Sequence, residues 1–559
     1  MMKFNADIDG IYNVMSLDEK IASMIVVRAC YTEAVRTDRV QNFFEDGKGV
    51  SVGKVILNSN VRDLNKTLEQ LNKLRTKSKF MPFFYIDGEQ GLVQSLSFAT
   101  PFPCQMALGA TFDTDLVYRS SYAIAKECRA LGFSIISQPV LDINTNPDNP
   151  IINTRAFGDN PDFVIKMSRA AIQGFQDGGV ATTGKHYPGH GDTAVDSHMA
   201  MPRVDKNRET LMEMELKPYK ELCPELWGIM SAHILYPALQ AEGEEDCPAT
   251  LSRAIIYDLP RKEFGFTGLM ISDSLTMKGI KDAYGIEKAA IGAILAGHDM
   301  ILQDYNSDPD ITFHCVKEAV LNGTIPMEQV EESVKRIIRF RFLTGGYDNR
   351  KVLEYDEVSK VVHCKEHVEL AKQIAHKAIT RVEMTAMPLK KGKKTLVIAT
   401  VSEQDGKYIE DYGLSDASGQ GIFYRAVQSN TDADFATMLE FPTPADIEKL
   451  CDKVKGYENV ILGSFMTVRA YAGKSSGRLS DEQVELISRL QKESQNFILL
   501  IFGGPYMLSS LDVQKDCLIA YGTNQDAIHS AVDAMFGKFE PTGKLPVNVP
   551  GRYAFGHSV

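Results

Sequence analysis

The chain has 559 residues, which is too long for one ordinary hydrophobic core, so we expect two or more domains. Hydrophobic residues make up 44% and charged residues 24%, a balance that is normal for a soluble globular protein. The formal net charge of −12, from 61 basic and 73 acidic residues, argues against a nucleic-acid backbone or an anionic membrane surface as the main partner.

The N-terminal segment and the cysteines bear on location. The first 20 residues contain no apolar stretch and no small-residue cleavage pattern, so no signal peptide is visible. The apolar run at residues 497–502 is far too short to span a membrane. The nine cysteines are scattered without a Cys-x-x-Cys pair, which fits free thiols in a reducing cytoplasm better than a disulfide framework. We therefore expect a cytoplasmic protein.

Strand and helix signals alternate through the first 345 residues. A helix is predicted over residues 115–131, where good helix formers end at Gly132. Repeated β-then-α units imply a parallel sheet, and about 250 residues of them suggest a (β/α)₈ barrel. A doubly wound sheet is the competing architecture, because periodicity alone does not distinguish a closed sheet from an open one. The predicted strands are residues 81–86, 134–140, 181–184, 228–232, 268–272 and 300–302.

The remainder of the chain divides into a connector, residues 346–394, and a second α/β unit, residues 395–559. The connector contains a predicted helix over residues 358–382 and ends in a lysine-rich turn. In the second unit Ser480 is a good N-cap with Gln483 three residues later, so a helix is predicted to start there. Buried strands are predicted at residues 395–399, 459–462, 497–502 and 517–521. The expected fold is therefore a TIM-type barrel followed by a C-terminal α/β/α sandwich.

The densest polar cluster follows the predicted strand 181–184. Residues 185–193 read Lys-His-Tyr-Pro-Gly-His-Gly-Asp-Thr, and Asp196, Ser197 and His198 follow. A metal site would use these His and Asp side chains as ligands, but their spacing matches no common metal motif. A structural loop, whose histidines bond backbone groups, is a second interpretation. In the third, Asp196 orients and charges the imidazole of His198 for proton transfer.

Other polar residues stand at the ends of predicted strands. Asp273 ends the strand 268–272, where it is either a rigidly held catalytic carboxylate or an N-cap of the next helix. Asp87, Asp142, Arg155 and His233 occupy similar positions. Each alone is more often a structural hydrogen-bonding group. Together they predict a ring of polar side chains at the barrel mouth, where barrel enzymes bind substrate.

These motifs together resemble glycoside hydrolase family 3, in its β-N-acetylglucosaminidase branch. The resemblance runs from roughly Ser16 to the C-terminus, and the Lys-His pair combined with Asp-x-His is its most specific part. The chain departs from the family at Ser274, often Asp, at His298, commonly a small residue, and in the order of residues 88–91. The motifs that carry it are residues 185–193 with Asp196-Ser197-His198, and residues 155–158, 264–273, 296–300 and 543–547.

The resemblance implies a role for each matching residue. Asp273 matches the nucleophile, and Asp196 with His198 matches the acid/base dyad. A carboxylate nucleophile implies a covalent glycosyl-enzyme and retention of configuration. An imidazole, with an ordinary pKa of about 6.5, suits both the acid and the base role near neutral pH. Residues that match contacts to sugar hydroxyls and the N-acetyl group are Asp87, Arg155, Lys185 and His186.

We therefore predict a retaining exo-β-N-acetylglucosaminidase that needs no metal or organic cofactor. Its expected partner is a small glycan with terminal N-acetylglucosamine, such as a muropeptide fragment in cell-wall recycling, and a homo-oligomer is compatible with the sequence. Phosphorolysis in place of hydrolysis is one alternative, because a neutral imidazole repels phosphate less than a carboxylate does. A β-glucosidase or β-xylosidase of the same family and a silent carbohydrate-binding protein are the others.

Overall fold

The structure is a computed structural model that describes residues 2–30, 52–56, 63–77, 84–197, 199–243, 246–303, 308–344, 352–467 and 478–559. The chain forms two compact units, each assembled from separated stretches of sequence. The first contains Met1–Phe102, Val117–Ile143 and Pro161–Val368. The second contains Pro103–Leu116, Asn144–Asn160 and Glu369–Val559. No described helix combines the length and the apolar character needed to cross a membrane.

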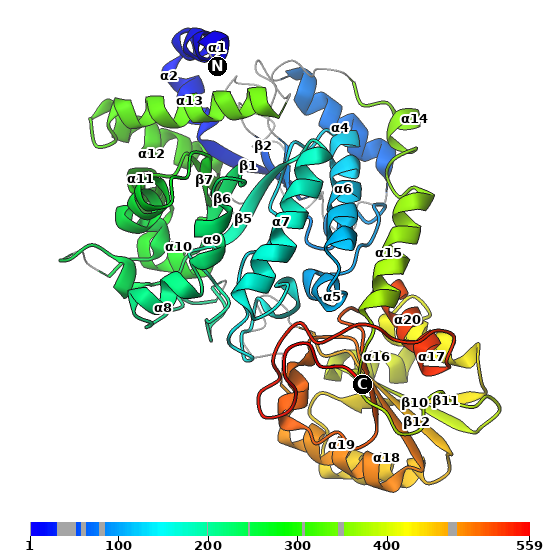
Figure 1. Cartoon of the computed structure of the whole chain (residues 1–559). Helices are drawn as coiled ribbons and strands as arrows, with labels where there is room; N and C mark the ends of the chain where they lie inside the picture. Colours follow the sequence, from blue (N-terminus) through cyan, green and yellow to red (C-terminus); the bar gives the residue numbers. More distant parts are fainter. Residues whose placement is uncertain are drawn as a thin grey trace. The chain divides into compact units, whose positions relative to one another are not determined.

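An eight-stranded parallel sheet forms the centre of the first unit (Figure 1). Its order is β2-β1-β8-β7-β6-β5-β4-β3, and the two end strands, β2 and β3, also contact each other. The sheet therefore curls round on itself, and the predicted barrel is confirmed. The strands are β1 (Ile25–Cys30), β2 (Val52–Ile56), β3 (Tyr85–Ile86), β4 (Ile135–Ile136), β5 (Ala181–Tyr187), β6 (Gly228–Ser231), β7 (Leu269–Ser274) and β8 (Met300–Gln303).

Helices lie outside these strands and cover the barrel (Figure 1). The predicted helix 115–131 is confirmed as α6, which is followed by Gly132 at φ 80°. Strand β5 is buried along its whole length, as expected for a barrel strand that is covered on both faces. The helices of this unit are α1 (Met2–Val14), α2 (Leu17–Ser23), α4 (Leu64–Lys77), α6 (Thr114–Ala130), α7 (Pro161–Asp177), α8 (Arg208–Glu213), α9 (Lys217–Leu222), α10 (Lys278–Tyr284), α11 (Ile286–Ala296), α12 (Pro309–Leu321), α13 (Met327–Leu343) and α14 (Tyr355–Val358).

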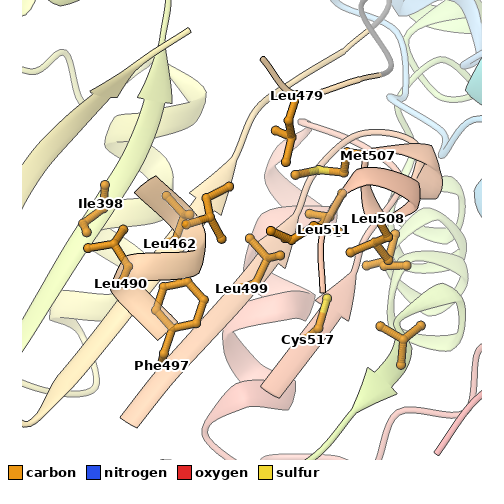
Figure 2. Packing of buried hydrophobic residues seen from close by; sticks show 14 of the residues in the cluster. Ile398, Leu462, Leu479, Leu490, Phe497, Leu499, Met507, Leu508, Leu511 and Cys517 are labelled. Carbon is orange, nitrogen blue, oxygen red and sulfur yellow. The ribbon is translucent and has the colours of Figure 1, made fainter. Parts of the chain in front are cut away.

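The second unit contains a six-stranded sheet in the order β11-β10-β12-β13-β14-β9, with only β9 antiparallel to its neighbour. Alternate residues of β10 belong to different cores, Ile398 to one and Val397 to the other, so both faces of the sheet are covered. Figure 2 shows Leu490 of α19 packed with Leu462 and Phe497 in the first of these cores. The predicted α/β/α sandwich is confirmed.

Three elements of this unit begin where the sequence predicted: β10, β12 and α19. Ser480 and Gln483 form the predicted capping box at the start of α19. The strands are β9 (Thr380–Glu383), β10 (Thr395–Val401), β11 (Ala433–Leu439), β12 (Asn459–Ser464), β13 (Asn496–Ile501) and β14 (Asp516–Ile519). The helices are α5 (Gln105–Ala110), α16 (Glu403–Tyr412), α17 (Gly419–Gln428), α18 (Pro444–Val454), α19 (Asp481–Glu493) and α20 (Gln525–Met535).

One predicted element is wrong. The expected helix 358–382 is interrupted at His363, whose φ of 57° lies in the left-handed region, and α15 (Lys365–Ala378) begins only afterwards. The last residues of the expected helix form β9, which pairs with β14. The domain limits at residues 345 and 394 stay a prediction, since the compact units meet between Val368 and Glu369.

Candidate active site

Lys185, near the end of β5, connects two carboxylates that follow β3. Its Nζ lies 2.6 Å from Oε1 of Glu89 and 3.2 Å from Oδ1 of Asp87, and its side chain is only 3% exposed. A buried ammonium group requires such partners, because an uncompensated charge away from water is costly. The structure thus brings the predicted residues Asp87 and Lys185 together and adds Glu89, which the sequence did not single out.

Asp142 is the next group at this end of the barrel. Its Oδ2 lies 2.7 Å from Nδ1 of His186, and its Oδ1 accepts a hydrogen bond of 2.6 Å from the backbone N–H of His190. Burial alone would raise the pKa of this carboxyl group, but the His186 imidazole and the hydrogen bonds hold the pKa below its ordinary value. An ionised Asp142 accepts a hydrogen bond from Nδ1–H of His186 and so fixes the orientation of that ring.

The loop after β5 carries Asp196, which is buried. The carbonyl oxygen of Asp196 accepts hydrogen bonds from the backbone N–H groups of Met199 (2.9 Å) and Ala200 (3.1 Å), which close a turn. His198, the predicted proton donor, lies outside the described residues. The start of the loop is fixed by Tyr236, whose hydroxyl donates to the carbonyl of Gly189.

Asp273 stands at the end of β7, where the nucleophile was predicted. The side chain is half-buried, and its Oδ1 accepts a 2.7 Å hydrogen bond from the backbone N–H of Ser274. Nε2 of His233 donates to the carbonyl of that same Ser274 at 2.9 Å, while Nδ1 pairs with Oγ1 of Thr250 at 2.7 Å. The described contacts of His233 therefore support the backbone beside Asp273.

Two observations show that these groups converge. Burial raises the pKa of the Tyr85 phenol on β3, and the carboxylates of Asp87, Asp273 and Glu89 raise it further. Asp87 follows β3 and Asp273 stands at the end of β7, and the ends of parallel strands open on the same side of the barrel, so the two carboxylates share its mouth. In addition, α10 packs on the Asp196 loop: a Cβ at Gly279 would lie 3.0 Å from the carbonyl oxygen of Ala200.

Comparison with known proteins identifies the family of the chain. Residues 16–340 match the model of the glycosyl hydrolase family 3 N terminal domain, which is more than half of the chain. The chain belongs to glycosyl hydrolase family 3.

Relatives in this family carry hexosaminidase names. A β-hexosaminidase A from Pseudoalteromonas piscicida is 34% identical over 52% of this chain and 53% of its own length, so the match spans about half of that relative. A β-N-acetylglucosaminidase/β-glucosidase from Cellulomonas fimi is 29% identical over 90% of this chain and 89% of its own. The solved family 3 β-N-acetylglucosaminidase from Paenibacillus sp. str. FPU-7 superimposes with a TM-score of 0.81 at 28% identity, covering 96% of this chain and 99% of that one.

Two further parts of the family 3 resemblance concern Arg155 and residues 298–299, and the role of Arg155 stays a prediction. Arg155, a predicted sugar-binding residue, belongs to the second unit, where its Nη1 donates to the carbonyl of Ile151 at 3.1 Å. His298 and Asp299 stand at the beginning of β8, opposite to the strand ends that carry the site. Oδ1 and Oδ2 of Asp299 bind the guanidinium groups of Arg336 (2.6 Å) and Arg261 (2.8 Å), which indicates a structural ion pair.

His298 is fully buried and has two hydrogen-bond partners. Its Nδ1 lies 2.8 Å from the carbonyl oxygen of Ala293, to which it must donate, and its Nε2 lies 2.8 Å from Oγ of Ser231. Burial lowers the pKa of His298 to about 4, so the ring is neutral and Nε2 accepts a hydrogen bond from the Ser231 hydroxyl. His298 is therefore a buried structural residue of the family 3 barrel.

Three supporting residues of the family 3 site received no individual role from the sequence: Glu89, Asp142 and His190. Asp142 was visible as a strand-end polar residue, and His190 as a member of the polar cluster. Nothing in the sequence connected Glu89 to Lys185, which lies 96 positions away. Its proximity depends on how β3 and β5 sit in the closed barrel.

Proposed function

We propose that the chain is a retaining exo-β-N-acetylglucosaminidase. The observation that carries the proposal is the position of Asp273 at the end of β7, with the Asp196 loop packed against α10, the helix that follows it. A carboxylate nucleophile and an acid/base group must flank one glycosidic bond, and these two elements are neighbours. The names of the relatives supply the sugar, since three of them are hexosaminidases or N-acetylglucosaminidases.

In the proposed first step, a carboxylate oxygen of Asp273 attacks C1 of the terminal sugar. The C1–O bond to the leaving group breaks, and that oxygen takes a proton from the imidazole of His198, which Asp196 orients. In the second step, water gives a proton back to the imidazole as its oxygen attacks C1 and releases Asp273. Two inversions give retention. Lys185, Asp87 and His186 are proposed to hold the sugar hydroxyls.

Water is the acceptor that the local charges favour over phosphate. Lys185 is a cation of the predicted sugar site, but Glu89 and Asp87 both lie within 3.2 Å of its Nζ. The three groups together carry a net charge of −1, while Asp273 is bound to C1 as a neutral ester when the acceptor attacks. An anionic acceptor gains little attraction there. We propose muropeptide fragments in the cytoplasm as natural substrates, in line with the scattered cysteines and the acidic net charge of the chain.

The test compares nitrophenyl β-N-acetylglucosaminide with nitrophenyl β-glucoside. We expect turnover of the first to exceed that of the second, with the same rate in the presence and absence of millimolar phosphate. A fluorinated N-acetylglucosaminide inactivator should label Asp273, and Asp273→Asn should lose nearly all turnover while remaining folded. Labelling of another carboxylate would refute the nucleophile, equal rates on both glycosides would refute the sugar, and a sugar 1-phosphate product would refute water as acceptor.

A further inference from the structure

Three buried side chains of the loop after β5 form a short hydrogen-bonded chain. Nδ1 of His190 lies 2.8 Å from Oγ1 of Thr193, and Nε2 of His190 lies 2.9 Å from Oγ of Ser197. Their exposed fractions are 2% for His190, 1% for Thr193 and 4% for Ser197. Ser197 stands between Asp196 and His198 in the sequence, so this chain ends on the residue that joins the two members of the proposed dyad.

The hydroxyl of Thr193 determines where the proton of His190 sits. That hydroxyl has one proton, which it donates to the carbonyl oxygen of His190 at 3.0 Å. It can therefore only accept from Nδ1, and Nδ1 carries the ring proton. In the neutral ring Nε2 then has a lone pair and accepts a hydrogen bond from the Ser197 hydroxyl. The imidazole is thus a directional acceptor for Ser197.

The same segment is held by two further contacts. The backbone N–H of His190 donates to Asp142, the carboxylate that also orients His186. On another side, a Cβ at Gly279 of α10 would lie 3.1 Å from the carbonyl oxygen of Ser197, so the backbone of Ser197 lies against the helix that follows the Asp273 strand. Ser197 is therefore fixed through its side chain by His190 and through its backbone by α10.

We propose that His190 is a positioning residue for the acid/base dyad. Its imidazole fixes the rotation of the Ser197 side chain, and with it the segment of the loop on which the neighbouring Asp196 stands. The inference rests on the proposed function, because it assumes that Asp196 and His198 deliver the proton. His190 itself touches neither sugar nor leaving group in this account, and its loss should impair only the step that needs proton transfer.

The experiment compares aryl N-acetylglucosaminides with activated and poor leaving groups, such as dinitrophenol and phenol. The full-length variants are Ser197→Ala, His190→Leu, His190→Gln and the double variant His190→Leu/Ser197→Ala. Losing one directional hydrogen bond should slow the phenyl substrate on the order of tenfold and the dinitrophenyl substrate about twofold or less. His190→Gln should recover part of the loss, since its amide oxygen can accept from Ser197.

The double variant tests whether the two residues act through one bond. We expect it to be no slower than His190→Leu alone, since the hydroxyl has nothing left to bond. A matched control is Ser231→Ala, which removes a buried serine hydroxyl that pairs with the Nε2 of His298. That variant should leave the ratio of the two rates at its wild-type value. If His190→Leu does not fold, Ser197→Ala and His190→Gln still carry the test.

The outcomes separate this inference from the proposed function. Equal losses on both leaving groups for Ser197→Ala, or additive losses in the double variant, would overturn the positioning role of His190 while the wild-type enzyme still cleaves both substrates. A wild-type protein that cleaves neither N-acetylglucosaminide would instead overturn the proposed function.

Discussion

The neutral state of His298 makes the stability of the barrel depend on pH. In the folded protein the pKa of His298 is lowered to about 4 by burial, whereas the unfolded chain protonates it at the ordinary value of 6.5. The contribution of the neutral ring is therefore fully present above pH 6.5 and is lost as the pH falls from 6.5 to about 4. A difference of one unit between the folded and unfolded pKa values is worth ~1.36 kcal/mol, so the free energy of unfolding falls by about 3 kcal/mol over this pH interval.

We expect His298→Asn to remove this dependence. Its amide can still donate to the carbonyl of Ala293, so the variant keeps one hydrogen bond while losing the titrating group. The assay is urea unfolding at pH 7, 6, 5 and 4, followed by the fluorescence of Trp227. This residue is the single tryptophan of the chain, and its ring packs at 5.9 Å on Phe340 in the first unit.

The wild-type protein should lose about 3 kcal/mol more than His298→Asn between pH 7 and pH 4, because the carboxylates that also titrate are shared and cancel in the difference. His314→Asn is the matched control, since His314 is exposed on α12, and it should follow the wild-type curve. Parallel curves for the wild-type protein and His298→Asn would refute the reasoning, because they would mean that burial does not hold this ring neutral.

Three further predictions concern the site. Glu89→Gln removes the carboxylate 2.6 Å from Lys185, so we expect KM for an aryl N-acetylglucosaminide to rise on the order of tenfold; a lower kcat at unchanged KM would contradict it. The pKa of Asp142 is lowered in the folded protein, so the ionised carboxylate stabilises the fold above about pH 4, and this stabilisation is lost as the pH falls further. Asp142→Asn should therefore lower the free energy of unfolding at pH 7 by roughly 2 kcal/mol. Urea titrations should show that the variant loses less stability than the wild-type protein on acidification. Gly279→Val should push on the Asp196 loop and slow poor leaving groups more than activated ones; unchanged rates on both would show that the contact is not needed.

The strand ends of the barrel could be predicted because fully buried strands are visible as apolar runs. Asp273 and Lys185 were found in this way, each as the polar residue that interrupts or ends such a run. The partners of these residues could not be found. Which carboxylate lies beside Lys185 depends on the neighbours and register of the strands, and the sequence contains no local signal for either.

The failed helix prediction has a similar cause. The periodic pattern of residues 358–382 is compatible with one helix, but Glu127 of α6 accepts hydrogen bonds from the backbone N–H of His363 and from Nδ1 of His367, both at 2.9 Å. This tertiary contact holds the chain in the conformation that separates α14 from α15. Strand β9 was missed because its side chains alternate between buried and partly exposed, and β11 because most of its side chains are partly exposed; neither forms an apolar run.

The course of the chain between the two units limits how the protein can be dissected. Residues 103–116 and 144–160 fold with the second unit although the barrel surrounds them in sequence, so the polypeptide passes from one unit to the other five times. Met106 of the first inserted stretch belongs to the core of the second unit, and Asp159 of the other accepts hydrogen bonds from Asn548. A cut between Val368 and Glu369 would therefore separate Met106 from the core in which it packs and take both inserted stretches away from the second unit. An exchange of the second unit with a relative requires three stretches of sequence to be replaced together.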